Sequence, residues 1–371
     1  MNVSDFDFDL PDELIAQEPP GDRGGSRLLV LDRRLGRMRD AVFAQLADYF
    51  TPGDLIVLND TRVYPARLLG VRVPSGGAVE CLLIRQLPTP NLPTPNETQS
   101  SIGSCDLGVG SSSWWEALVH PGQKLKPGSQ VSFTDGGLQL HGEILHRHFQ
   151  GRRTVRLWTG DGSDVAAAID RLGHVPLPPY IKREDRVADR ERYQTVYARA
   201  RGSIAAPTAG LHFTSELLGH LHARGIERTE ITLHVGYGTF KPVRVDTVEE
   251  HVVDAERFSV SADAAAALTR ARSEGRRVIA VGTTTTRALE SVAIEADGRI
   301  AASTGETQLF IRPGHEFRVV RGMITNFHLP RSSLLMLVAA FAGREQALAA
   351  YHHAVAERYR FYSYGDAMLI L

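Results

Sequence analysis

The sequence predicts an α/β protein whose main domain is split by an inserted small antiparallel β-barrel. Short apolar strands alternate with helix-like stretches before residue 61 and after residue 159. Between these limits, short β-segments follow one another with no helical period, as in a small barrel. We therefore expect one α/β domain formed by residues 1–60 and 160–371, and a barrel domain formed by residues 61–159.

The N-terminal part shows the α/β pattern in its shortest form. Residues 28–31 and 54–58 are apolar runs of strand length, and residues 41–50 between them resemble a short helix. This strand–helix–strand order indicates the beginning of an open sheet.

The barrel segments are separated by turns such as PSGG and TDGG. Six strands are expected, at residues 66–73, 78–84, 115–119, 130–133, 138–146 and 154–157. Residues 88–113, with the near-tandem PTPN, are low in complexity, so we predict a disordered loop there.

After the barrel, the alternation of strands and helices returns and continues to the end of the chain. Strands are expected at residues 230–235, 257–260, 278–281, 307–311 and 322–326. Helices are expected at residues 215–224, 262–274, 285–296, 333–342 and 345–358.

Bulk composition excludes several classes of protein. Of the residues 43% are hydrophobic and 23% charged, and the net charge is −1, so no strongly basic nucleic-acid binder is indicated. No apolar run is long enough to cross a membrane, and the acidic N-terminus does not resemble a signal peptide. Two cysteines form neither a disulfide framework nor a Cys-rich metal site. We expect a cytoplasmic protein without a metal.

Two segments combine glycine with histidine where a strand ends or a helix begins. In APTAGLHFT, residues 206–214, His212 precedes a predicted helix and is either an acid, a base or a buried structural histidine. In LHVGYGTFKP, residues 233–242, two glycines allow close backbone approach to a ligand, and Tyr237 or Phe240 could stack on a base. A plain turn explains this segment equally well.

The segment VGTTTTRALES, residues 281–291, joins a strand to a helix. It is not a phosphate-binding P-loop, because no Gly-Lys-Ser/Thr follows Gly282 at the required spacing. Its hydroxyls, free backbone N–H groups and Arg287 suit a carboxylate, a phosphate or a ribose hydroxyl. The alternative is that Thr285 or a neighbour only caps the helix.

Further polar residues gather near strand ends and in one basic stretch. Asn326 and His328 flank a phenylalanine, and three acids and a histidine in residues 250–256 resemble a proton-transfer cluster more than a metal site. The aromatic tail 359–371 suits a core as well as a base-stacking surface. Residues 182–201 are rich in arginine, which indicates either phosphate binding or a solvated helix face with Glu–Arg pairs.

Long motifs spread over nearly the whole chain resemble one enzyme family, the S-adenosylmethionine:tRNA ribosyltransferase-isomerases. They are FDLPDELIAQEP, SRLLVLDR, GDLIVLNDTRVYPARL, YQTVYA, IAAPTAGLHFT, LHVGYGTFKPV, GTTTTRALES, TGETQLFI, ITNFHLPRSSLLMLVAAFAG and YRFYSYGDAMLI. The family's α/β domain carrying a β-barrel agrees with the pattern above.

The resemblance implies a transferase of queuosine biosynthesis, a tRNA modification. It would transfer and isomerise the ribosyl moiety of S-adenosylmethionine onto 7-aminomethyl-7-deazaguanine at the tRNA wobble position. The products would be epoxyqueuosine-tRNA, adenine and methionine. S-adenosylmethionine would be a consumed substrate, no cofactor would be needed, and a monomer is expected.

The reaction needs a base for the C5′ proton and a proton donor for the departing adenine. The resemblance points to His212, His234 and His328 for proton transfer, with Glu306 pairing a ribose hydroxyl or an amine. The expected substrate-binding residues are Thr208, Gly210, Gly236, Tyr237, Gly238, Thr283, Thr284, Thr285, Thr286, Arg287, Asn326, Tyr364 and Asp366. The expected tRNA-binding residues are Lys182, Arg183, Arg186 and Lys241.

The chain departs from the family pattern at two positions. Asp254 stands where a second histidine near His251 is expected, which puts a two-histidine role there in doubt. Arg331 replaces an expected lysine, so the charge is kept while the geometry differs.

Two other functions compete with the transferase. An S-adenosylmethionine-dependent RNA methyltransferase would be expected to carry a Gly-rich loop after its first strand, which the sequence lacks. A non-catalytic RNA-binding protein would show a strongly basic surface with stacked aromatics, and that signature is only partly present.

Overall fold

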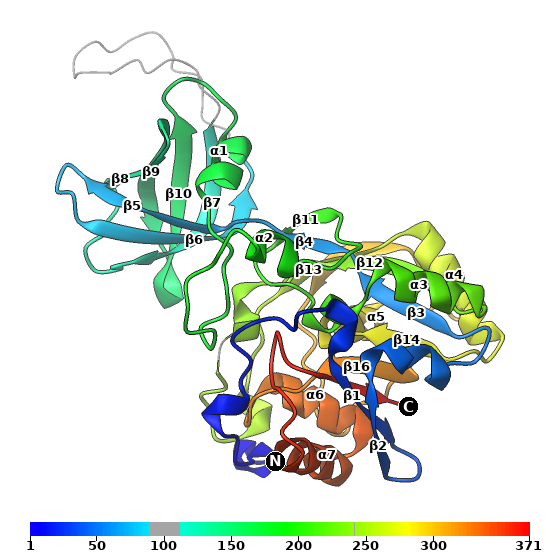
Figure 1. The fold of residues 1–371 in the computed structure, drawn as a ribbon. Coiled ribbons are helices and arrows are strands. Elements are labelled where there is room, and N and C mark those ends of the chain that lie inside the picture. Colours follow the sequence, from blue (N-terminus) through cyan, green and yellow to red (C-terminus); the bar gives the residue numbers. More distant parts are fainter. Residues whose placement is uncertain (90–111, 241) are drawn as a thin grey trace. The chain divides into compact units, whose positions relative to one another are not determined.

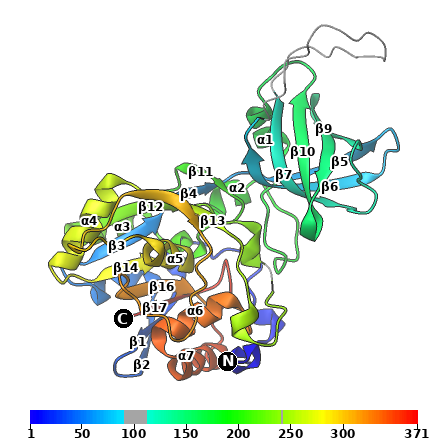
Figure 2. The same cartoon turned by 180° about the vertical axis from the view of Figure 1, so that it is seen from behind.

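The computed structural model describes residues 1–89, 112–240 and 242–371. Contacts divide the chain into two compact units: Met1–Val63 with Leu177–Leu371, and Tyr64–Pro176 (Figures 1 and 2). The first is built around an open sheet and the second around a closed barrel. The predicted fold class, an α/β domain interrupted by an antiparallel barrel, is confirmed.

The open sheet has nine strands, and its centre is parallel. In spatial order the strands are β15 (Ser303–Thr307), β13 (Glu256–Val260), β12 (Glu227–Leu233), β3 (Leu55–Asn59), β14 (Val278–Val281), β16 (Gly322–Asn326), β17 (Ala367–Ile370), β1 (Arg27–Asp32) and β2 (Arg37–Val42). Strands β12, β3, β14 and β16 run parallel, whereas β17 is antiparallel to β16.

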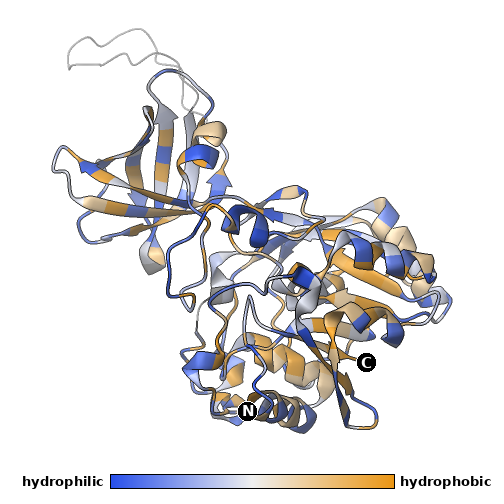
Figure 3. Ribbon diagram, in the orientation of Figure 1, coloured by the Kyte–Doolittle hydropathy of each residue, from blue (hydrophilic) through white to orange (hydrophobic). Residues whose placement is uncertain are grey.

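Helices cover both faces of this sheet because its strands are apolar on both sides (Figure 3). Leu29 and Leu31 face one core, while Leu28 and Val30 face the other, as the period of two in a strand requires. The first core is covered by α4 (Ala262–Ser273), α5 (Thr283–Ser291), α6 (Ser333–Ala342) and α7 (Arg344–Ala356). The second is covered by α3 (Ser215–Ala223) and the 3₁₀ helix Phe43–Tyr49.

The barrel closes in the order β10, β7, β6, β5, β8, β9. Its strands are β5 (Arg67–Val73), β6 (Ala78–Leu87), β7 (Ser112–His120), β8 (Gln130–Asp135), β9 (Leu138–Arg147) and β10 (Arg152–Thr159). All six barrel strands predicted from the sequence are present. Residues 112 and 113, predicted to lie in the disordered loop, begin β7; residues 90–111 of that loop are outside the described residues.

The second boundary of the barrel unit differs from the prediction at residue 159. Helix α1 (Val165–Leu172) packs against β8, β9 and β10, so the barrel unit extends to Pro176. The short elements α2 (Asp189–Arg192), β4 (Thr61–Val63) and β11 (Ala200–Ser203) complete the first unit, with β4 and β11 paired in parallel.

Local boundaries agree well where a strand or helix is fully apolar. The predicted bounds of β14, β16 and α6 are the observed ones. Strand β2 was missed because its residues are mostly exposed, and the strand predicted at 307–311 instead ends at Thr307. Among the described residues, no single helix is long and apolar enough to cross a membrane. Helices α6 and α7 reach the required length and hydropathy only when they are taken together, and the chain bends by 116° between them.

Candidate active site

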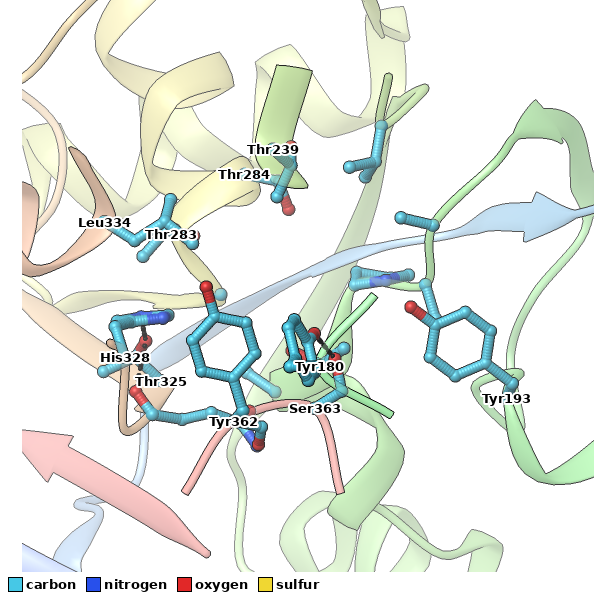
Figure 4. Close-up of a pocket in the computed structure, with 18 residues that line it drawn as sticks. Tyr180, Tyr193, Thr239, Thr283, Thr284, Thr325, His328, Leu334, Tyr362 and Ser363 are labelled. Carbon is cyan, nitrogen blue, oxygen red and sulfur yellow. Dashed lines mark hydrogen bonds between the residues drawn. The ribbon is translucent and has the colours of Figure 1, made fainter. Parts of the chain in front are cut away.

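A pocket lies at the carboxyl ends of the parallel strands in the first unit. Val235 follows β12, Gly282 follows β14 and His328 follows β16, and all three line the pocket. Figure 4 shows His328 among the lining side chains. Because these strands run in the same direction, their ends meet at one edge of the sheet, where open α/β sheets bind ligands.

The C-terminal tail reaches the same edge because β17 runs antiparallel to β16. Asn326, at the end of β16, pairs with Ala367, at the start of β17. The residues that precede β17, Tyr362 and Ser363, therefore lie beside the pocket. The backbone N–H of Tyr362 donates to the carbonyl of Phe327 at 3.0 Å, and this tyrosine has a φ of 73°, unusual for a residue with a side chain.

The pocket is lined by uncharged groups. The lining residues are Tyr180, Tyr193, Ala205, Ala206, Pro207, Thr208, Ala209, Val235, Thr239, Gly282, Thr283, Thr284, Thr325, Asn326, His328, Leu334, Tyr362 and Ser363. None is a carboxylate, a lysine or an arginine, so hydroxyls, amides, one imidazole and backbone groups supply the polar contacts.

His328 lines this pocket, and its imidazole is neutral. Its ring Nε2 lies 2.8 Å from the Thr325 hydroxyl, and its backbone N–H donates to the Tyr351 hydroxyl at 3.1 Å. Burial lowers the pKa of His328 to about 3. At neutral pH this ring can therefore accept a proton or a hydrogen bond, and it carries no positive charge.

The four threonines of α5 divide into two pairs. Thr283 and Thr284 line the pocket. Thr285 donates its hydroxyl to the carbonyl of Val281 at 2.6 Å, and Thr286 donates to that of Gly282 at 3.1 Å. The hydroxyls of Thr285 and Thr286 are therefore bonded within the fold, and neither residue lines this pocket, so their expected role in substrate binding stays a prediction.

Capping of α5 also differs from the prediction. The N-cap is Gly282, with a φ of 94°, and no side chain caps the helix. Thr285 lies inside the helix. A glycine suits the N-cap because this backbone conformation is strained for residues with a side chain.

Arg287 contacts a carboxylate of the protein. Its guanidinium is buried in an ion pair with Glu256 at the start of β13. Glu256 also accepts the backbone N–H of Gly236 at 3.0 Å and the hydroxyl of Thr239 at 3.3 Å. Arg287 therefore ties α5 to the loop after β12, and it does not line the pocket expected to bind the substrate.

The other two candidate histidines do not line the pocket. His212 is buried, its Nδ1 lies 2.8 Å from the Ser26 hydroxyl, and burial lowers its pKa to about 4. His234 has its Nδ1 2.9 Å from the Thr61 hydroxyl, and burial lowers its pKa. Gly202 packs against the His234 ring so closely that a Cβ would lie 2.6 Å from Cε1. The structure gives both histidines packing partners, as the structural alternative for His212 expected.

The glycine-rich segments contribute less to the pocket than predicted. Gly210 packs against Tyr197, and Gly238 packs against Asp254. From these segments the pocket takes Thr208, Val235 and Thr239, while Gly236 and Tyr237 are outside its lining.

Three acidic or aromatic candidates lie elsewhere. Glu306 is exposed on β15. Tyr364 donates its hydroxyl to Asp189 at 2.9 Å, and Asp366 accepts the backbone N–H groups of Arg27 and Arg360 at 2.9 and 2.8 Å. None of the three lines the pocket, so their predicted contact with substrate has no support in this geometry.

The predicted tRNA-binding residues make ion pairs within the first unit. Arg183 contacts both carboxylate oxygens of Asp189, at 2.7 and 2.9 Å. Arg186 pairs with Glu18 at 3.1 Å, and Lys182 pairs with Asp12 at 3.3 Å, both at exposed positions. Lys241 lies outside the described residues.

Sequence reasoning missed the aromatic side of the pocket. Tyr193 lies within the arginine-rich stretch 182–201 and Tyr180 just before it, whereas Tyr362 and Ser363 belong to the aromatic tail. The Tyr180 hydroxyl lies 2.5 Å from that of Ser363, 183 residues away. No local pattern signals such a contact. Across the described ranges, no group of three or more His, Cys, Asp or Glu is arranged to hold a metal ion.

The comparisons with known proteins cover the whole chain. The family model of queuosine biosynthesis proteins matches residues 3–370. The chain is 47% identical to the S-adenosylmethionine:tRNA ribosyltransferase-isomerase of Halothermothrix orenii and 49% identical to that of Syntrophotalea carbinolica, each over 372 residues and 100% of both proteins.

A solved structure agrees. The crystal structure of S-adenosylmethionine tRNA ribosyltransferase from Thermotoga maritima matches with a TM-score of 0.53 and 36% identity, over 99% of this chain and 100% of that one. The chain belongs to the family of queuosine biosynthesis proteins.

Proposed function

We propose that the chain is an S-adenosylmethionine:tRNA ribosyltransferase-isomerase. It transfers and isomerises the ribosyl moiety of S-adenosylmethionine onto 7-aminomethyl-7-deazaguanine at the tRNA wobble position. Epoxyqueuosine-tRNA, adenine and methionine are the products. S-adenosylmethionine is consumed as a substrate and no cofactor takes part. The whole-chain likeness to relatives that carry this name supports the proposal.

The observation that carries the proposal is the uncharged pocket at the sheet edge. S-adenosylmethionine brings its own charges, a sulfonium, an ammonium and a carboxylate. The carboxylate suits the start of α5, where free backbone N–H groups adjoin the hydroxyls of Thr283 and Thr284.

His328 is the pocket group best suited to move a proton. It is neutral at pH 7, and Thr325 orients its ring. A pKa this low makes a protonated His328 unstable. Because so low a pKa makes His328 a weak base, we propose that it takes the C5′ proton only in concert with proton transfer to the departing adenine.

The tRNA must approach from outside the pocket, since the ribosyl group is transferred to a base of a large substrate. Lys182 and Arg186 have exposed side chains, and their ion pairs are with exposed carboxylates. Exposed pairs contribute little to stability and can be exchanged for phosphates. We retain both, together with Lys241, as tRNA contacts. A monomeric, cytoplasmic enzyme remains our prediction.

One incubation tests this function. The full chain is mixed with S-adenosylmethionine and tRNA bearing the aminomethyl-deazaguanine base, and the small products are separated. We expect free adenine and methionine in equal amounts, with loss of the primary amine from the tRNA. S-adenosylhomocysteine would instead indicate a methyltransferase, and no turnover would favour a binding protein. tRNA with unmodified guanine is the control and should give no adenine.

A further inference from the structure

Two buried polar atoms of residues that line the pocket make no hydrogen bond of good geometry. They are the hydroxyl oxygen of Tyr193 and the amide oxygen Oδ1 of Asn326. Tyr193 is fully buried and Asn326 is 2% exposed. A poorly satisfied buried polar group costs about 1–3 kcal/mol, so two of them on residues that line one pocket point to a ligand that satisfies both.

The two atoms gather around the same dipeptide. The Asn326 amide donates its Nδ2 hydrogen to the carbonyl of Tyr362 at 2.9 Å, which leaves Oδ1 as the free end. Tyr193 lies near Ser363, whose hydroxyl is already 2.5 Å from that of Tyr180. The left-handed backbone of Tyr362 holds this arrangement together, and such backbone strain is common at ligand sites.

The wall around these atoms is aromatic. The rings of Tyr180 and Tyr362 meet edge to face with centroids 3.8 Å apart, and both line the pocket with Tyr193 (Figure 4). A flat ligand is favoured here, because aromatic walls offer dispersion and stacking surface. Beside Asn326 a carboxylate is disfavoured, since Oδ1 would repel it; a carboxylate is better placed at the start of α5.

Of the parts of S-adenosylmethionine, adenine fits this wall. Its exocyclic amine is a hydrogen-bond donor, and the ring nitrogens beside that amine are acceptors. Resting on the proposed function, we propose that the tyrosine wall is the adenine subsite, in which Asn326 accepts from the exocyclic amine and Tyr193 donates to an adjacent ring nitrogen. The subsite distinguishes adenine from other purines and binds the base as it leaves.

His212 acts behind this subsite. Its ring contacts the side chain of Asn326, while Nδ1 lies 2.8 Å from the Ser26 hydroxyl. His212 is therefore a positioning residue that orients the Asn326 amide. This assigns the histidine of the TAGLHFT motif a role that requires no proton transfer.

The first test uses the unmodified protein and three free bases. Binding of adenine, purine and hypoxanthine to the full chain is measured by calorimetry. Purine lacks the exocyclic amine, and hypoxanthine replaces it with an acceptor oxygen that opposes Oδ1 of Asn326. Losing one hydrogen bond to a buried partner weakens binding by about tenfold or more, and we expect this for both analogues relative to adenine. Equal affinity for the three bases would overturn the subsite.

The second test uses a matched pair of tyrosine variants. Tyr193→Phe removes only the hydroxyl, and we expect it to weaken adenine binding and raise KM for S-adenosylmethionine by about tenfold. Tyr197→Phe is the control: that hydroxyl is also buried and unpartnered, but Tyr197 does not line this pocket. Its adenine affinity should equal that of the unmodified protein.

The outcomes separate the subsite from the proposed function. If the unmodified enzyme releases adenine and methionine while Tyr193→Phe keeps KM and adenine affinity unchanged, the subsite is wrong and the function stands. If the unmodified protein gives no turnover with modified tRNA, the function is wrong, whatever its affinity for adenine.

Discussion

The guanidinium of Arg287 and the carboxylate of Glu256 form a buried ion pair that joins α5 to β13, and the same carboxylate holds Gly236 and Thr239 after β12. Thr239 lines the pocket, so this pair sets the position of one pocket wall. Arg287, next to the threonines of α5, therefore has a structural role in holding the site together.

Breaking this pair should destabilise the protein. Glu256→Gln keeps the shape of the side chain but leaves the Arg287 charge buried and uncompensated, at a cost of about 3–5 kcal/mol in the free energy of unfolding. Chemical denaturation measures this loss. Glu249→Gln is the control, because Glu249 pairs with Arg312 at the surface and the same change there should leave stability nearly unchanged. Equal losses in the free energy of unfolding for the two variants would show that the buried Arg287–Glu256 pair does not stabilise the site.

The threonine pairs should separate binding from stability. Thr283→Val removes a pocket hydroxyl, and we expect a several-fold higher KM for S-adenosylmethionine with unchanged stability. Thr286→Val removes the hydroxyl bond to Gly282 and should lower the free energy of unfolding by about 0.5–1.5 kcal/mol with unchanged KM. Steady-state kinetics and denaturation of both variants check this. A higher KM in Thr286→Val alone would reverse the assignment.

Acid should weaken the fold through its buried histidines. The pKa values of His212 and His328, about 4 and about 3, lie below the value near 6.5 of an unfolded histidine. The unfolded chain therefore binds more protons, so this stability is complete above pH 6.5 and is lost as pH falls towards the folded values. At pH 5 each histidine costs about 2 kcal/mol.

Denaturation at pH 7 and pH 5 measures this loss, and His212→Gln should reduce the difference between the two pH values by about half of the histidine contribution. An unchanged difference in this variant would show that His212 is not buried in its neutral form.

His328 and Glu306, both expected to be catalytic, should behave differently. His328→Gln keeps a polar side chain in the pocket but cannot accept a proton, and we expect kcat to fall by about 10²–10⁴-fold. Glu306→Gln changes an exposed strand residue outside the pocket and should keep kcat within a factor of about two. Single-turnover release of adenine measures both. Normal kcat in His328→Gln would exclude proton transfer by this residue.

Local sequence was sufficient for the architecture. The bounds of β14, β16 and α6 and all six barrel strands follow from apolar runs and turn residues, because a buried strand or helix must carry a continuous apolar pattern. The family also follows from sequence, because its motifs are long and cover the chain, and the family prediction is confirmed.

The composition of the site, in contrast, could be determined only from the folded structure. The sequence placed hydroxyls and Arg287 at the start of α5, but helix geometry and a carboxylate 31 residues away determine that two threonines face the pocket and that Arg287 does not. Likewise the hydroxyls of Tyr180 and Ser363, 183 residues apart, meet only in the folded chain, and the antiparallel pairing of β17 with β16 brings Ser363 to that edge of the sheet. Periodicity reports which face of an element is buried, whereas the partner across that face depends on the order and direction of strands, which local patterns do not encode.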